Sequence, residues 1–268
     1  MLNGLTQLNI ELTSRCDKKT LCGMCGHQDA SVNPGLRFGD MSAACMVALA
    51  KELSPLGRSL VVQFHRDGDP LAFDHLHEAL QIFAPHLRSI VTHGERLVAQ
   101  AQALIGHCES VCVSVFRGDP DREIQLAALR GFLDIKGDRL PRVLVKVVGD
   151  MREDELAPLT ELGVPLLWRR LHTPEANTKY AHGAPTMPEH GLCLDLLHHP
   201  SVAWDGRVYL CNRLDTRDAG VIGDLHTQTF DQIWNGPIRA SAVQAHLDGR
   251  RQDVPPCRDC RYYGVPAS

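Results

Sequence analysis

Short apolar segments alternate with longer amphipathic ones over the first 172 residues of this chain. Six short segments have the length and the Val, Ile and Leu content of buried strands: residues 7–12, 59–65, 88–93, 110–116, 142–149 and 164–170. Between them, five longer segments space apolar residues three and four apart, which predicts helices with one buried face: residues 42–57, 73–87, 97–107, 122–135 and 153–162.

Strands that alternate with helices predict a parallel sheet covered by its crossover helices. Six such units are too few for a closed eight-stranded barrel, so the pattern leaves a partial barrel or a doubly wound sheet. In both folds the loops after the carboxyl ends of the strands carry the chemistry.

Composition narrows the function classes. The 268 residues are 44% hydrophobic, enough for a large core. A formal charge of -4, without a run of lysines or arginines, argues against sequence-independent binding of duplex nucleic acid. Residues 1–13 show no signal-peptide pattern, and no run of eighteen apolar residues predicts a membrane span. We therefore expect a cytoplasmic, enzyme-sized protein.

Ten cysteines are many for a compartment that reduces disulfides, so metal ligation is the better explanation. Cys45, Cys108 and Cys112 lie in predicted helix or strand segments and are expected to be buried small hydrophobes. The other seven fall into an N-terminal and a C-terminal set. These seven are the predicted metal ligands: Cys16, Cys22, Cys25, Cys193, Cys211, Cys257 and Cys260.

The N-terminal set follows the first predicted strand, so its three thiolates are expected on a loop over the functional edge. Three cysteines suit a four-iron cluster in which one iron lacks a protein ligand. A zinc site that borrows His27 or a distant fourth ligand fits the same spacing. The spacing alone does not decide between the two metals.

The C-terminal set surrounds a predicted hairpin. Residues 203–211 read as strand, tight Asp205-Gly206 turn and strand, and residues 221–236 read as a turn followed by a short helix. A zinc ribbon is the alternative to iron here. However, a ribbon usually pairs two C-x2-C knuckles, and only Cys257 and Cys260 form one.

Together, these cysteine groups make the chain resemble the radical S-adenosylmethionine superfamily. The resemblance implies a partial (β/α)6 barrel over residues 1–185, a [4Fe-4S] cluster on the N-terminal set and S-adenosyl-L-methionine bound to its open iron. The family commonly has three residues between the first two cysteines, whereas five separate Cys16 from Cys22. Met24 would lie close to the adenine of the cofactor.

Three further segments support the resemblance and imply cofactor contacts. Asp67, Gly68, Asp69 and Pro70 look like the family's GGEP turn after the second strand, where backbone and an acidic side chain receive the methionine ammonium. His93 stands where the family's TNG segment has asparagine. Ser114 is where the family often places a polar contact to the ribose or carboxylate.

The C-terminal part resembles the twitch domain, the shortened SPASM extension. The resemblance implies a domain over residues 186–268 whose four cysteines bind one auxiliary [4Fe-4S] cluster, so two clusters in total. Such enzymes reductively cleave S-adenosylmethionine to a 5'-deoxyadenosyl radical with an external electron donor such as flavodoxin or ferredoxin. The auxiliary cluster would accept an electron from the substrate radical.

Three function classes follow. The favoured one oxidises or rearranges a small polar molecule such as an aminocyclitol, sugar or nucleoside, because an aminocyclitol dehydrogenase of the twitch group is similar in size and cysteine order. Arg169 or Arg170 would then anchor substrate and His172 act as acid or base. Modification of a peptide or protein side chain is the second class, although the chain starts at the first strand without a peptide-binding module. A non-enzymatic zinc protein is the third.

Overall fold

The computed structural model describes residues 2–18, 35, 37–149, 151–169, 192–212, 218–258 and 260. Its described strands form one open sheet in the order β6-β5-β4-β3-β2-β1-β7-β8-β9. Six consecutive parallel strands make up the larger part: β1 (Gln7–Ile10), β2 (Val61–Phe64), β3 (Leu87–Thr92), β4 (Ser110–Phe116), β5 (Arg142–Val148) and β6 (Leu166–Arg169). The predicted partial (β/α)6 barrel is confirmed, and the sheet is not closed.

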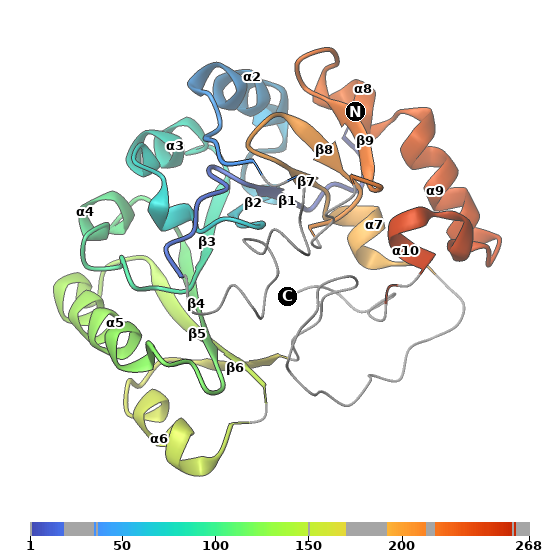
Figure 1. Cartoon of the computed structure of the whole chain (residues 1–268). Helices are drawn as coiled ribbons and strands as arrows, with labels where there is room; N and C mark the ends of the chain where they lie inside the picture. Colours follow the sequence, from blue (N-terminus) through green and yellow to red (C-terminus); the bar gives the residue numbers. More distant parts are fainter. Residues whose placement is uncertain are drawn as a thin grey trace.

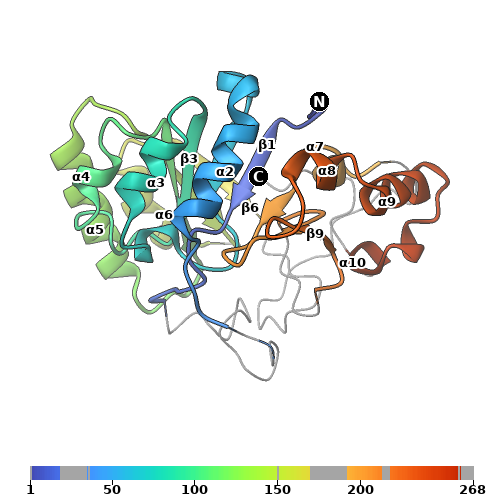
Figure 2. The ribbon, with the colours of Figure 1, turned by 90° about the horizontal axis from the view of Figure 1, so that it is seen from above.

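Helices cover one face of these parallel strands (Figure 1; Figure 2). They are α2 (Ala43–Leu53), α3 (Leu76–Ile82), α4 (Ala101–Leu104), α5 (Arg122–Lys136) and α6 (Glu153–Thr160), with 3-10 turns at Ser54–Ser59 and Pro70–Ala72. The predicted helix 97–107 is regular only over the four residues of α4. By contrast, α2 begins as the sequence predicts, because Ser42 Oγ accepts the backbone N–H of Cys45.

The alternation along each strand separates the core from a polar face. Val62 and Phe64 of β2 and Val111, Val113 and Val115 of β4 are fully buried beneath the helices. Their neighbours in sequence point to the opposite face. This second set, which we call the polar face, includes Asn9, Glu11, Gln63, His65, Ser110, Ser114 and Lys146.

The C-terminal part extends the same sheet. Strand β7 (Ser201–Val202) pairs in parallel with β1, and β8 (Arg207–Tyr209) and β9 (Val221–Asp224) continue antiparallel. The Asp205-Gly206 turn is present, with Gly206 at φ 86°. The helices of this part are α7 (Leu194–His198), α8 (Phe230–Trp234), α9 (Pro237–Leu247) and α10 (Pro255–Arg258), with a 3-10 turn at Arg251–Asp253.

One sequence expectation needs correction here. Residues 221–224 form strand β9 rather than a turn, because β8 offers them a free edge next to the hairpin. The hairpin is also joined to β1 by main-chain hydrogen bonds, Asn9 N to Pro200 O and Glu11 N to Val202 O. The proposed boundary between residues 185 and 186 lies outside the described residues. Among the described helices, none is long and apolar enough to cross a membrane.

Candidate functional site

The loop after β1 carries Cys16 over the carboxyl edge of the parallel strands. Ser14, two residues before Cys16, is held on both sides, since its backbone N–H donates to Gly39 O and its Oγ accepts from Gly39 N. Arg15 forms an ion pair with Asp40. Cys16 itself is partly buried. The other predicted residues of this loop, Cys22, Met24 and Cys25, lie outside the described residues.

The turn after β2 packs directly against this loop. A Cβ added to Gly68 would lie 1.9 Å from the carbonyl oxygen of Thr13, so only glycine allows this approach. The backbone N–H of Gly68 donates to Glu11 Oε1 at 3.2 Å, and the backbone N–H of Asp69 donates to Arg15 O at 2.8 Å. The sequence placed the turn and the cysteine loop at one edge, and the structure brings them into contact.

Asp69 is buried and joins the ends of two neighbouring strands. Its carboxylate accepts from Leu71 N at 2.8 Å, Thr92 Oγ1 at 2.7 Å and His93 N at 2.9 Å, and it lies 3.2 Å from His93 Nε2. Thus Asp69 fixes both the turn and His93. The neighbouring Asp67 pairs with Arg66 at 2.5 Å. Contact of these residues, or of Pro70, with a cofactor stays a prediction.

His93 and Ser114 lie side by side near the carboxyl ends of β3 and β4. The amide of Gln125 bridges them, because Nε2 donates to the backbone carbonyls of His93 and of Ser114. Ser114 is paired in register with Lys146 on β5. Lys146 was not predicted as a site residue, although a lysine inside an apolar strand is a signal of a functional position that the sequence offers.

His65 adds a titratable group to the polar face just after β2. Burial, and to a smaller extent the charge of Lys146, lowers the pKa of His65 to about 3, so the imidazole is neutral at physiological pH. On β6 the backbone of Arg169 pairs with Val148. Arg170 and His172 lie outside the described residues.

The four C-terminal cysteines gather in space. Burial raises the pKa of the Cys257 thiol, and the negative charges of Cys211, Cys193 and Cys260 raise it further. Such mutual repulsion of thiolates is relieved when a cationic metal centre binds them, so the donor set fits an iron-sulfur cluster. In the described part of the chain, no three such side chains are arranged to hold a single metal ion.

Hydrogen bonds from neighbouring side chains to backbone carbonyl oxygens hold these cysteines in place. Arg251 Nη1 donates to the carbonyl oxygens of Cys257 at 3.0 Å and Cys260 at 3.1 Å. Ser201 Oγ donates to Cys211 O at 2.7 Å, which ties that cysteine to β7. Of the cysteines expected to be structural, Cys108 and Cys112 are buried, and burial raises the pKa of Cys108 to about 12.

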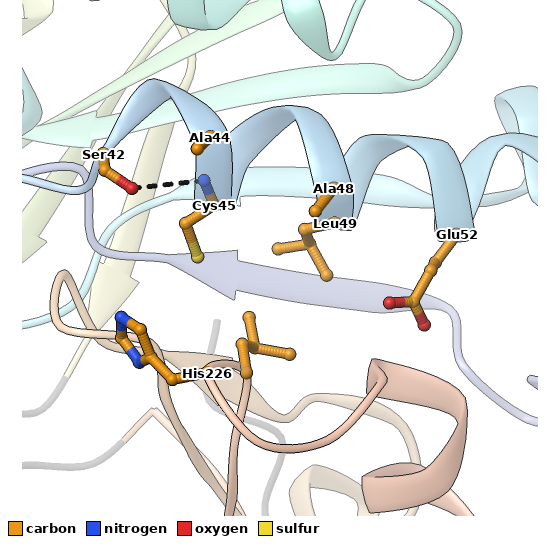
Figure 3. Close-up of a pocket in the computed structure, with 8 residues that line it drawn as sticks. Ser42, Ala44, Cys45, Ala48, Leu49, Glu52 and His226 are labelled. Carbon is orange, nitrogen blue, oxygen red and sulfur yellow. Dashed lines mark hydrogen bonds between the residues drawn. The ribbon is translucent and has the colours of Figure 1, made fainter.

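A separate pocket of about 230 Å³ lies between α2 and the segment after β9 (Figure 3). Cys45 and Glu52 of α2 and His226 line it, and Cys45 and His226 face the same space. Burial raises the pKa of Cys45, so its thiol is protonated at neutral pH. The described cysteine loop and the turn at Asp67–Pro70 contribute no lining residue.

Comparisons with known proteins agree with the prediction for the C-terminal cysteine group. Residues 193–261 match the model of the SPASM family, described as an iron-sulfur cluster-binding domain. A comparison with the sequences of curated proteins finds no significant match. The resemblance to a SPASM-type C-terminal region is therefore confirmed.

Among solved structures, the fold is similar to BtrN in complex with AdoMet and 2-DOIA, with TM-score 0.64, 16% identity and coverage of 97% of this chain and 95% of BtrN. It is also similar to Streptococcus suis SuiB bound to its precursor peptide SuiA, with TM-score 0.58, 11% identity and coverage of 88% of this chain and 66% of SuiB. SuiB bound to S-adenosylmethionine matches with TM-score 0.59 and 11% identity, and the match covers 97% of this chain and 72% of SuiB. These structures confirm the expected likeness to the radical S-adenosylmethionine fold.

Proposed function

Because residues 193–261 belong to the SPASM family of iron-sulfur cluster-binding domains, we propose that this chain is a radical S-adenosylmethionine enzyme with one auxiliary cluster. The observation that carries the proposal is the direct contact between the loop of Cys16 and the turn at Gly68. If Cys16 is a cluster ligand, this contact would put its thiolate next to backbone groups that a cationic amine can approach closely. The fold shared with structures that hold S-adenosylmethionine supports the same assignment.

Cys16, Cys22 and Cys25 would hold the first [4Fe-4S] cluster, and the four C-terminal cysteines the second. Met24, the turn at Asp67–Pro70, His93 and Ser114 would contact S-adenosyl-L-methionine. The bound cluster and cofactor would supply radical chemistry that removes a hydrogen atom from a substrate carbon, by reductive cleavage of the cofactor to a 5'-deoxyadenosyl radical. An external flavodoxin or ferredoxin would deliver the electron.

The chain's own residues would position these groups. Asp69 fixes the turn and His93 relative to each other, and Gly68 permits the close contact with the cysteine loop. The neutral imidazole of His65 can accept or donate a hydrogen bond on the polar face without adding charge. Arg169 or Arg170 would anchor the substrate, and His172 would act as acid or base.

The substrate class we favour is a small polar molecule, such as an aminocyclitol, sugar or nucleoside, that is oxidised or rearranged. The support is the near full mutual coverage with BtrN, whereas only 66% and 72% of the SuiB chains are covered. Modification of a peptide side chain is the second candidate, which the similarity to SuiB bound to SuiA favours. Residues 1–185 would form the catalytic domain and 186–268 the auxiliary one.

The test is an anaerobic count of iron, sulfide and zinc on reconstituted protein, followed by dithionite, S-adenosylmethionine and detection of 5'-deoxyadenosine. About eight irons per chain and formation of deoxyadenosine are expected from two cysteine-bound clusters. Joint replacement of Cys16, Cys22 and Cys25 by alanine should halve the iron and abolish cleavage. Two zinc ions without cleavage would overturn the proposal in favour of a structural zinc protein.

A further inference from the structure

A buried lysine lies within the unusual five-residue spacing between Cys16 and Cys22. Lys18 is 4% exposed, although lysine is rarely buried without partners. Its Nζ lies 2.5 Å from Glu95 Oε1, 3.0 Å from Asp119 Oδ2 and 3.4 Å from Asp121 Oδ2. The loop that carries Cys16 is therefore tied to groups far away in the sequence.

The three carboxylates come from two other loops at the same edge of the sheet. Glu95 follows β3, while Asp119 and Asp121 connect β4 to α5. The side chain of Asp119 is fully buried, and its Oδ1 accepts the backbone N–H of Asp121 at 3.0 Å, so the carboxylate is oriented by its own loop. One ammonium thus joins the loops after β1, β3 and β4.

A second ion pair on the same loop provides a contrast. Asp17, next to Lys18, pairs with Arg96 at 2.8 Å, but these side chains are 50% and 43% exposed. Exposed pairs are screened by water and stabilise little, whereas loss of one partner of a buried pair leaves uncompensated charge. Burial alone would lower the pKa of Lys18, yet the bonds and charges of Glu95 and Asp119 outweigh it and raise the pKa.

The geometry points to Lys18 as the positioning residue of the cysteine loop. By holding the stem of the loop against the loops after β3 and β4, it fixes the place of Cys16 before any metal binds. The anchoring stands on the contacts alone, while its role in holding a cluster rests on the proposed function.

The test compares Lys18→Met, which keeps an unbranched apolar stem and removes the charged ammonium, with Arg96→Met, which breaks the exposed pair of the same loop. The first readout is the rate at which iodoacetamide labels Cys16 in the metal-free, reduced full chain, followed by mass spectrometry. We expect Lys18→Met to raise this rate about tenfold through local opening of the loop, and Arg96→Met to leave it within about twofold.

The second readout is iron after reconstitution. Lys18→Met should retain about four of the eight irons, because the C-terminal cysteines are untouched. Adding Asp119→Asn to Lys18→Met removes one of the uncompensated charges and should lower the labelling rate again and recover part of the iron. This recovery is not expected if Lys18→Met only unfolds the chain.

Unchanged labelling of Cys16 and full iron content in Lys18→Met would overturn the anchor. A double variant that labels as fast as Lys18→Met would also overturn it, since the charges would then be irrelevant. If the wild type binds only four irons, the proposed function fails, but the contrast in labelling between the two methionine variants still decides the anchor.

Discussion

The closest backbone approach at the candidate site leads to a quantitative prediction for Gly68→Ala. The new Cβ would lie 1.9 Å from Thr13 O and 2.8 Å from both the carbonyl carbon and the Cα of Ser14. Real Cβ atoms essentially never come within 3.0 Å of such atoms, so the turn and the cysteine loop must separate by about 1 Å. Because the obstacles are backbone atoms, no side-chain rotation relieves the clash.

This separation has an energetic cost. Overpacking of a well-packed site typically costs about 1–3 kcal/mol, and the hydrogen bond from Gly68 N to Glu11 is weakened as well. We therefore expect a loss of about 3 kcal/mol in the free energy of unfolding. For a chain of this size, that corresponds to a decrease in Tm of roughly 6–12 °C.

The assay is thermal unfolding of the metal-free protein, followed by far-UV circular dichroism under reducing, anaerobic conditions. Gly35→Ala is the matched control, since a Cβ added there meets no atom of the described residues within 4 Å. The Tm of this variant should stay within about 2 °C of the wild type. A wild-type Tm for Gly68→Ala would refute the close contact. It would also remove the observation on which the proposed function rests.

Three further predictions concern other parts of the molecule. Arg251→Ala removes the donor to the carbonyl oxygens of Cys257 and Cys260. The iron retained after exposure to a chelator should fall from about eight towards about four per chain. Full retention of iron would contradict a role of Arg251 in holding these cysteines. Trp204→Ala removes the ring that covers Gly39, and urea unfolding should show a loss of about 2 kcal/mol. Burial lowers the pKa of His65 to about 3, whereas the pKa of a histidine in the unfolded chain is near 6.5. The unfolded chain therefore binds more protons between these two pH values, and the free energy of unfolding falls as the pH decreases from about 6.5 to 3. His65→Phe should therefore show a smaller decrease in Tm than the wild type between pH 7 and pH 5, and equal decreases would place His65 in water.

Much of the fold could be predicted because buried parallel strands are continuous apolar runs. Residues 110–116 form β4 with the bounds that the sequence indicated. Strand β9 was missed, since its four residues contain Gly223 and Asp224, which are poor strand formers, and only the partner strand β8 makes them extended. The pairing of β7 with β1 was missed for a similar reason, because it joins residues almost two hundred positions apart.

The residues of the candidate site also differ in whether the sequence alone indicates them. Cysteines can be recognised along the sequence itself, so the sequence indicated both candidate metal-binding groups. Glu11, which accepts from Gly68 N at 3.2 Å and from Trp204 N at 3.2 Å, is a buried acid whose partners are distant in sequence. Lys18 is a similar case, since its three carboxylates lie on two other loops. Side chains of this kind become recognisable only when the chain is folded.

The position of β7 beside β1 has a consequence for biosynthesis. One side of β1 is paired once residues 61–64 have left the ribosome, but the other side must wait for residues 201–202. At about 5–20 residues per second, that edge stays open for roughly 7–30 s. During this interval the nascent chain presents an unpaired strand that invites pairing with other chains. Fragments that end before residue 200 should therefore aggregate rather than yield an isolated barrel, so separate expression of the two parts requires a substitute strand for β7.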